Sequence, residues 1–211
     1  VGGMARIRMI GRFGFIDTKG NILVAPFSDE VENFAEGCTV VTIKNKVGMV
    51  TFDGDWIVSP MFDTGGSLSG GLAWMGSKGL FGYIDKSGEF VIPQKYSHAM
   101  DFNAEYGLAC VAVKGRWGVI DRSGAEILPF EHDKVTVSAD GYILAEKDGK
   151  SGIFTGDGTM VYPIECDAVE LHKGTVMFRH GVAAARMDGK RVHIDLFGNV
   201  IWQYSTLTDC L

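Results

Sequence analysis

The stretch RWGVIDRSGAEILP, residues 116–129, decides the fold because it recurs along the chain. Related stretches lie at residues 12–26, 46–60, 80–93, 150–163 and 191–202. We align these stretches on the residue that corresponds to Gly118, which follows Trp117 in the quoted stretch. These anchor residues are Gly14, Gly48, Gly82, Gly118, Gly152 and Val192. Successive anchors lie 34, 34, 36, 34 and 40 residues apart. A regular period of this length predicts six tandem units, each of which stacks on its neighbours.

Glycines recur at fixed distances from each anchor. Eleven residues before it stand Gly3, Gly37, Gly71, Gly107, Gly141 and Gly181, and six residues after it stand Gly20, Gly54, Gly88, Gly124, Gly158 and Gly198. Three residues before it stand Gly11, Asn45, Gly79, Gly115, Gly149 and Gly189. Asn is the other residue that tolerates positive φ, so this position predicts a tight hairpin turn.

Between the turns, the residues are β-branched, aromatic or aliphatic, as in Leu108–Val113 and Trp117–Ile120. No segment keeps a helical period over ten residues. Each unit is therefore predicted to contain three strands, with a possible short fourth strand in the connecting piece.

Two series of aspartates follow the same grid. Asp17, Asp85, Asp121 and Asp195 lie three residues after the anchor, where Thr51 and Thr155 replace them in two units. Asp29, Asp63, Asp133 and Asp167 lie fifteen residues after it, with Ser97 in the third unit. Asp and Thr side chains both hydrogen-bond to nearby backbone, so we interpret these series as turn or cap residues rather than catalytic groups.

The phrases FGYIDKSGEFVIPQKY (81–96) and RWGVIDRSGAEILPFEHD (116–133) resemble the WG-containing repeat family, which is found mostly in bacteria. Only Trp117–Gly118 is a literal Trp-Gly pair. The family carries no general biochemical activity, so the resemblance implies a β-repeat scaffold and does not specify a reaction.

The expected fold is all-β: a single repeat domain over residues 1–211 that closes into a six-bladed β-propeller. The tail Tyr204–Leu211 would then supply the strand that the first unit lacks. The alternative is an open, β-solenoid-like stack of hairpins. Such a stack needs polar caps, and no cap is evident from the sequence at either end.

Composition narrows the classes of partner. The net charge of −6 and the pI of about 5.3 argue against nucleic acid, which requires a basic footprint. No apolar run is long enough to predict a membrane span, and no signal peptide is recognised. The scattered Cys38, Cys110, Cys166 and Cys210 favour buried thiols in a reducing compartment such as the cytoplasm. We expect a monomer.

No motif for catalysis, metal binding or cofactor binding stands out. The histidines His98, His132, His172, His180 and His193 share no repeat position. Neither a P-loop nor a nucleophile elbow is present. We therefore expect a protein that is not an enzyme and that holds no cofactor or metal.

The sixth unit departs most from the repeat. Its connection from Pro163 to Gly181 spans 18 residues, against 11 from Pro26 to Gly37. It gathers Lys173, Arg179, His180, Arg186, Lys190, Arg191 and His193. These residues predict a contact surface for an acidic protein partner; the alternative is a terminal repeat that has drifted and carries solvated charges. The first connection is acidic, with Asp29, Glu30, Glu32 and Glu36, and would complement the sixth unit at the seam of a closed ring.

Trp74 stands where other units have smaller residues, so it is a second candidate for partner binding, as an exposed hot spot or a sugar-stacking platform. The leading functional hypothesis is a non-catalytic scaffold for protein interactions. A glycan- or cell-wall-binding module and a hydrolase with carboxylates at a central channel are the alternatives.

Overall fold

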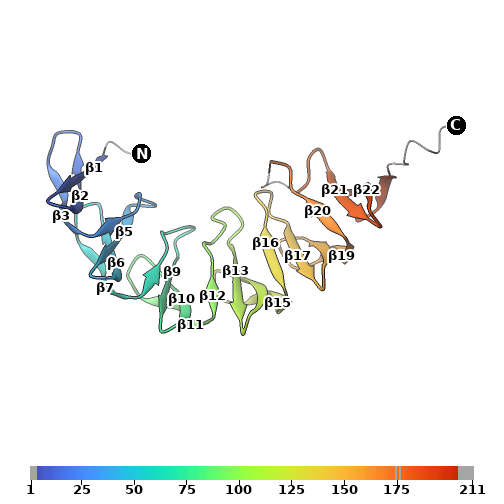
Figure 1. The fold of residues 1–211 in the computed structure, drawn as a ribbon, viewed down its shortest axis with the longest axis horizontal. Helices are drawn as coiled ribbons and strands as arrows, with labels where there is room; N and C mark the ends of the chain where they lie inside the picture. Colours follow the sequence, from blue (N-terminus) through green and yellow to red (C-terminus); the bar gives the residue numbers. More distant parts are fainter. Residues whose placement is uncertain (1–3, 174, 176, 204–211) are drawn as a thin grey trace. The chain divides into compact units, whose positions relative to one another are not determined.

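The computed structural model describes residues 4–173, 175 and 177–203, and these form β-strands joined by turns and connections (Figure 1). The all-β prediction is confirmed. The chain divides into two compact units, Val1–Ala104 with Arg122–Gly124 and Glu105–Asp121 with Ala125–Leu211. Each unit is described by itself, and the single repeat domain stays a prediction. The tail predicted to complete the first unit, Tyr204–Leu211, lies outside the described residues.

The first compact unit holds three antiparallel sheets. The first sheet contains β1 (Met4–Met9), β2 (Arg12–Asp17) and β3 (Ile22–Ser28). The second contains β4 (Glu30–Val31), β5 (Cys38–Ile43), β6 (Lys46–Thr51) and β7 (Trp56–Phe62). The third contains β8 (Thr64–Gly65), β9 (Ala73–Ser77), β10 (Leu80–Ile84) and β11 (Phe90–Tyr96), and the short strand β12 (His98–Ala99) follows it.

The second compact unit repeats the pattern. The fourth sheet includes β13 (Leu108–Val113), β14 (Arg116–Asp121) and β15 (Glu126–His132). The fifth contains β16 (Lys134–Val137), β17 (Ile143–Lys147), β18 (Lys150–Phe154) and β19 (Met160–Cys166). The sixth contains β20 (Ala168–Glu170), β21 (Val182–Met187), β22 (Lys190–Asp195) and β23 (Val200–Gln203). The predicted short fourth strand of the connecting piece is confirmed by β4, β8, β16 and β20.

The hairpin between the first two long strands of each sheet turns at the predicted position. Lys44 and Asn45 both have positive φ, 50° and 60°, as do Lys114 and Gly115 in the fourth repeat, 51° and 80°. Two consecutive positive φ values define the type I′ turn, whose twist matches that of the flanking strands. The need for Gly or Asn three residues before the anchor follows from this turn.

The anchor glycine is required by a close approach of two strands. A Cβ on Gly118 would lie 2.5 Å from the carbonyl oxygen of Leu128, which is far inside van der Waals contact. Strand pairing is irregular at this point, because Trp117 pairs with His132 and Val119 pairs with Leu128. All five prolines of the chain lie in the equivalent looped-out segments, at Pro26, Pro60, Pro93, Pro129 and Pro163. The anchor and the proline are therefore two parts of one bulge.

The first aspartate series forms turns, as predicted. Asp17 Oδ1 accepts the backbone N–H groups of Lys19 and Asn21, both at 2.8 Å. Hydrogen bonds from the Asn21 side chain and backbone lower the pKa of Asp17. Thr155 forms the equivalent turn in the fifth repeat, where its Oγ1 accepts the backbone N–H of Thr159 at 3.1 Å.

The second aspartate series joins consecutive repeats. Asp63 Oδ1 accepts a hydrogen bond from Lys46 Nζ at 2.6 Å, and its Oδ2 accepts the backbone N–H of Lys78, in the hairpin turn of the next sheet, at 2.8 Å. Equivalent pairs of contacts are made by Asp29 to Arg12 and Lys44, by Asp133 to Arg116 and Asp148, and by Asp167 to Lys150 and Gly189. We call this arrangement the aspartate clamp. In the third repeat both members change together, to Leu80 and Ser97.

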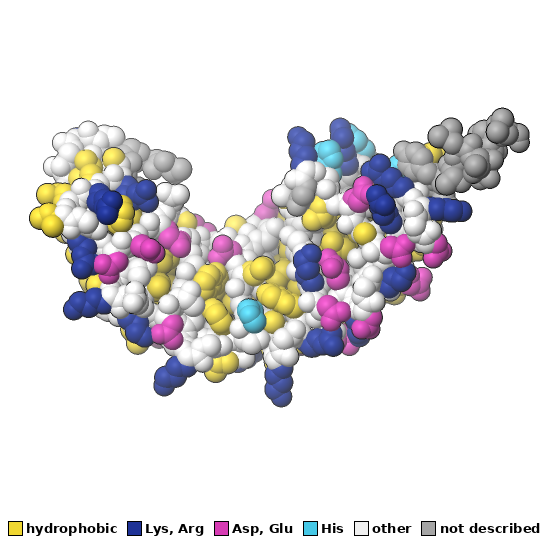
Figure 2. All heavy atoms as spheres, viewed as in Figure 1, with side chains coloured by type: hydrophobic (Ala, Val, Ile, Leu, Met, Phe, Trp, Pro, Cys, Tyr) yellow, Lys and Arg dark blue, Asp and Glu magenta, His cyan; other side chains and the backbone are white. Residues whose placement is uncertain are grey.

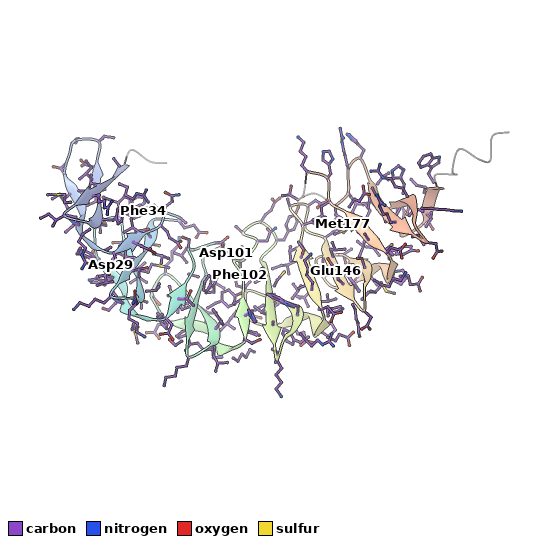
Figure 3. All side chains as sticks on the ribbon, in the orientation of Figure 1. Asp29, Phe34, Asp101, Phe102, Glu146 and Met177 are labelled. Carbon is purple, nitrogen blue, oxygen red and sulfur yellow. The ribbon has the colours of Figure 1, made fainter. Side chains whose placement is uncertain are left out.

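Three of the four acidic groups of the first connection, Asp29, Glu32 and Glu36, are engaged within their own compact unit. Asp29, labelled in Figure 3, forms the first clamp. Glu32 Oε2 accepts a hydrogen bond from Ser67 at 2.7 Å, and Glu36 accepts the N–H of Gly71 at 3.1 Å and pairs with Lys86 at 3.3 Å. These contacts tie the connection to later repeats, and pairing with the sixth unit across a seam stays a prediction.

The core lies between consecutive sheets. Within each compact unit, one side of a sheet, its forward side, carries the residues one before, one after and ten after the anchor, and it packs against the next sheet of that unit. In the second sheet Val47, Met49 and Val58 lie there, and they share a cluster with Met75 and Ile84 of the third. Ile153 and Tyr162 of the fifth sheet pack in the same way with Ala183, Ala185 and Ile194 of the sixth. Burial on this forward side is the main source of stability.

Candidate functional site

The sixth sheet has a polar forward side. The three forward positions, buried or half-buried in earlier sheets, are Arg191, His193 and Trp202 here. The residue ten after the anchor is at most 9% exposed in the five earlier sheets, at Val24, Val58, Ile92, Leu128 and Tyr162, whereas Trp202 is 44% exposed. We call Arg191, His193 and Trp202 the sixth-sheet face. No cap-like signal in the sequence had indicated polar residues at these positions.

The sixth sheet lacks the bulge at the anchor. Val192 replaces the anchor glycine and the unit has no proline, so β22 and β23 pair from Val192 opposite Gln203 to His193 opposite Trp202. The two rings of the latter pair stack with centroids 5.3 Å apart and planes at 22°. The residues one and ten after the anchor pair in the bulged sheets too, as Ile153 and Tyr162 do. The exchange of these two residues therefore puts an imidazole and an indole side by side on the surface.

A pocket of about 530 Å³ lies beside this face in the second compact unit. Leu171, Met177, Val182 and Ala184 supply apolar lining, and Glu170, His172, Lys173, Arg179, Arg191 and His193 supply polar lining. Figure 2 shows Lys, Arg and His side chains gathered over β20–β22. A volume of this size suits a small ligand or a few side chains of a partner.

Glu170 is the carboxylate among the pocket-lining residues, and it is already paired. Its Oε2 accepts a hydrogen bond from Arg191 Nη2 at 2.9 Å, and its Oε1 lies 3.6 Å from Arg186 Nε. The Glu170 side chain keeps 37% of its surface exposed and that of Arg191 keeps 47%. Lys173 and Arg179 make no ion pair within residues 4–173, 175 and 177–203. The lining therefore carries an excess of positive charge.

The long connection is fixed at the base of the pocket by Asp140. Its carboxylate accepts the backbone N–H groups of Met177 at 3.0 Å and Phe178 at 2.8 Å. Partial burial opposes ionisation of Asp140, but these hydrogen bonds outweigh it and lower its pKa. Met177, labelled in Figure 3, is 1% exposed and belongs to the core of the fifth and sixth sheets. The extra residues of the connection are thus anchored rather than merely inserted.

The residues predicted in the sixth unit do not all meet. Arg179, Arg191 and His193 line the pocket together, as does Lys173. Arg186 lies at its edge through the ion pair with Glu170. His180 occupies a tight turn with φ of 53° and is exposed, and Lys190 is exposed at the start of β22; neither lines the pocket. His172, Met177 and Glu170 also line the pocket and were not predicted to do so. For Glu170, the only indication available was its place on a short strand.

Trp74 lies on β9, in the first compact unit. It is half-buried, and its Nε1–H donates to Asp101 Oδ1 at 2.9 Å. Its ring also contacts Phe81, with centroids 5.8 Å apart. The indole therefore has partners within its own compact unit, and a role for Trp74 in binding a partner or a glycan stays a prediction.

The carboxylates of the turns give no support to the hydrolase alternative. A catalytic pair requires at least one raised pKa, but hydrogen bonds lower the pKa of Asp17, Asp85 and Asp195. Within the described ranges, no group of three or more His, Cys, Asp or Glu is placed to hold a metal ion. The same part of the chain contains no helix with the length and apolarity needed to cross a membrane.

The buried cysteines are free thiols. Cys38, Cys110 and Cys166 are each in the core, and Cys210 lies outside the described residues. Burial raises the pKa of Cys110 and of Cys166 to about 11, which disfavours the reactive thiolate.

Comparison with known families supports the resemblance seen in the sequence. The model of the WG containing repeat matches residues 13–46, 81–117 and 117–150, which correspond to the first, third and fourth repeats. A search of curated proteins finds no match.

Solved structures share the fold at low sequence identity. A structure titled as the eukaryotic initiation factor aligns with a TM-score of 0.55 and 11% identity over 97% of this chain and 63% of its own. Hsv2p of Kluyveromyces lactis aligns with a TM-score of 0.50 and 11% identity over 99% of this chain and 76% of its own. Both neighbours are β-propeller proteins. The tandem sheets are therefore propeller-like, while closure into a ring stays a prediction.

Proposed function

Because this chain belongs to the WG-containing repeat family, we propose that it is a non-catalytic binding scaffold and that it docks an acidic protein partner on the sixth-sheet face and the adjoining pocket. The observation that carries the proposal is the change of the forward positions from apolar to Arg191, His193 and Trp202. Repeat scaffolds typically bind through broad, rigid surfaces.

The composition of the face supports a protein partner. Trp and Arg are the residue types enriched at binding hot spots, because they combine large contact area with directed polar groups. Here Trp202 is held by stacking on His193, and Arg191 lies on the same face. Groups already fixed in place lose less conformational entropy when a partner binds.

The charge of the pocket supports an acidic partner. Lys173, Arg179 and Arg191 outnumber the single carboxylate of Glu170 among the lining residues, although the chain as a whole carries a net charge of −6. A local positive field on an acidic protein steers anionic groups to one place and repels them elsewhere.

The test compares capture of partners from lysate by three forms of the full chain. The first is native, the second carries Lys173→Glu and Arg179→Glu, and the third carries Lys19→Glu and Lys114→Glu as a matched control. All four side chains are exposed and none is in an ion pair within the described residues, so both double variants are expected to fold.

We expect a protein retained by the native chain and by the Lys19/Lys114 control to be lost from the Lys173/Arg179 variant. Thermal unfolding of the three forms verifies that they are equally folded. Retention by all three would contradict docking at the sixth sheet, and retention of neutral or basic proteins alone would contradict an acidic partner.

Other parts of the proposal concern what the protein does not do. We propose that it has no catalytic activity, cofactor or nucleic-acid partner and that it is a monomer. The lowered pKa of the turn aspartates, the raised pKa of the buried thiols and the acidic composition support this view. The bacterial source implied by the resemblance stays a prediction.

A further inference from the structure

Glu170 is placed differently from the other carboxylates on the repeat grid. The clamp aspartates each bind a cation and the turn of the next hairpin, whereas Glu170 lies on the short strand β20 and faces two arginines of its own sheet. It also lines the pocket beside Lys173 and Arg179. Its position therefore combines an internal ion pair with the site proposed for an acidic partner.

The preceding sheet also contains an ion pair between its short strand and the next strand. There, Lys134 of β16 pairs with Glu146 of β17 at 3.0 Å, and Glu146 occupies the same repeat position as Arg186. Glu146, labelled in Figure 3, is negatively charged where Arg186 is positively charged, and it is not among the residues that line the pocket. Lys134 lies directly opposite Glu146, whereas Glu170 lies two residues along β20 from Ala168, the residue opposite Arg186. The fifth sheet thus offers a carboxylate in a cross-strand ion pair away from the pocket, which makes Glu146 a control for the loss of one negative charge.

Arg191 has no such counterpart. The residue before the anchor is Phe13, Val47, Phe81, Trp117 or Ser151 in the other repeats. An arginine here places a guanidinium on the forward side of the sheet, where Glu170 is the one carboxylate among the residues that line the pocket. A guanidinium presents several donors in a planar fork and readily exchanges one carboxylate for another.

We infer that the pocket receives a glutamate or aspartate side chain of the acidic partner at Arg191, and that Glu170 is an internal competitor that holds Arg191 until the partner displaces it. This inference rests on the proposed function. Both members of the Glu170–Arg191 pair are about 40% exposed, with values of 37% and 47%. Exposed ion pairs contribute little to stability, so a multiply charged segment can displace one without unfolding the sheet.

The experiment measures binding of a fluorescent hexaglutamate peptide to the full chain, with hexaglutamine as the neutral probe. Removal of the internal competitor by Glu170→Gln is expected to tighten hexaglutamate binding roughly three- to tenfold, because one repelling charge and one competing pair are lost. Arg191→Gln is expected to weaken binding about tenfold or more. Glu146→Gln, the matched control, is expected to leave the affinity unchanged.

A second measurement does not depend on how the variants fold. In the native chain, NMR signals of the arginine side chains are followed during titration with hexaglutamate. Those of Arg191 are expected to move, whereas those of Arg116, which is paired with Asp133 in a clamp, are expected to stay.

The outcomes separate the inference from the proposed function. If hexaglutamate binds and Lys173→Glu with Arg179→Glu abolishes binding, but Glu170→Gln has no effect or weakens it, the internal competitor is overturned and the docking site stands. If hexaglutamate binds no better than hexaglutamine, the acidic partner itself is overturned. If inorganic phosphate displaces hexaglutamate at lower concentration than glutamate does, the choice of a carboxylate is overturned in favour of a phosphorylated ligand.

Discussion

The fifth and sixth sheets have the same strand order but opposite uses for their forward sides. In the fifth, Ile153 and Tyr162 are buried, with exposures of 0% and 8%, against small residues of the next sheet. In the sixth, the same two repeat positions are His193, which lines the pocket, and Trp202, which stacks on His193 and is 44% exposed. The comparison shows that a few side chains decide whether the forward side of a sheet forms a core or carries polar groups at the surface, while the strand order is kept.

The largest expected effect comes from placing the residue of the sixth sheet in the fifth. Ile153→His puts a polar ring into a position with no exposure, and should destabilise the second compact unit by about 3 kcal/mol or more. The reverse exchange, His193→Ile, should change stability by less than about 1 kcal/mol, because that position is only half-buried. Urea unfolding of both variants measures the difference, and equal effects would break the comparison.

A smaller effect is expected at the anchor. Gly118→Ala places a Cβ 2.5 Å from the Leu128 carbonyl oxygen and should cost about 1–3 kcal/mol, since the two strands must separate. Val192→Ala, at the same repeat position, removes buried methyl groups without any clash. Thermal unfolding measures the cost of each variant, and amide hydrogen exchange shows whether the glycine variant alone loses protection in β14 and β15. Preserved protection in Gly118→Ala would contradict the bulge as the reason for glycine.

The smallest expected effect concerns a turn whose aspartate has been exchanged for threonine. The hydroxyl of Thr155, with further hydrogen bonds from Thr159, lowers the pKa of Asp157 to about 2. Thr155→Ala should raise this pKa toward its usual value of 3.8, as followed by NMR titration of the carboxyl carbon. The pKa of Asp85, in the third repeat, should stay low and serves as the control.

The sign of the accompanying pH dependence follows from linkage. A carboxyl whose pKa is lowered by folding stabilises the folded state above its unfolded pKa, and this contribution is lost as the pH falls through the folded value. The stability gap between native protein and Thr155→Ala should therefore be full at pH 6 and should shrink between pH 4 and pH 2. A gap that widens on acidification would contradict the assignment.

Much of the fold could be predicted because the repeat imposes backbone requirements that residue types reveal. Gly or Asn before the anchor indicated a hairpin turn, and the turn aspartates with their threonine replacements indicated side-chain hydrogen bonds to the backbone; both are confirmed. The apolar position two after the anchor also indicated a strand. Such features are local, so a single chain without relatives is enough to read them.

Features that join neighbouring repeats were harder to predict. The aspartate clamp links residues 17 apart and then reaches the next hairpin, so its chemistry depends on how two sheets pack. The pocket was signalled only by a cluster of cations, and the sequence did not single out Glu170, whose importance comes from facing Arg191 across the sheet. Side-chain proximity between strands requires the register, which the pattern of residues left open.

The pairing of each strand with strands close in sequence bears on how the chain assembles during synthesis. In the second, fifth and sixth sheets, each strand pairs with the one before or after it in the chain, and the short strand comes directly before its long partner. The chain loses little entropy when it closes the short loops between strands that are adjacent in sequence, and folding rates rise as contacts become more local. A ribosome-bound chain can therefore complete one sheet for each repeat that emerges.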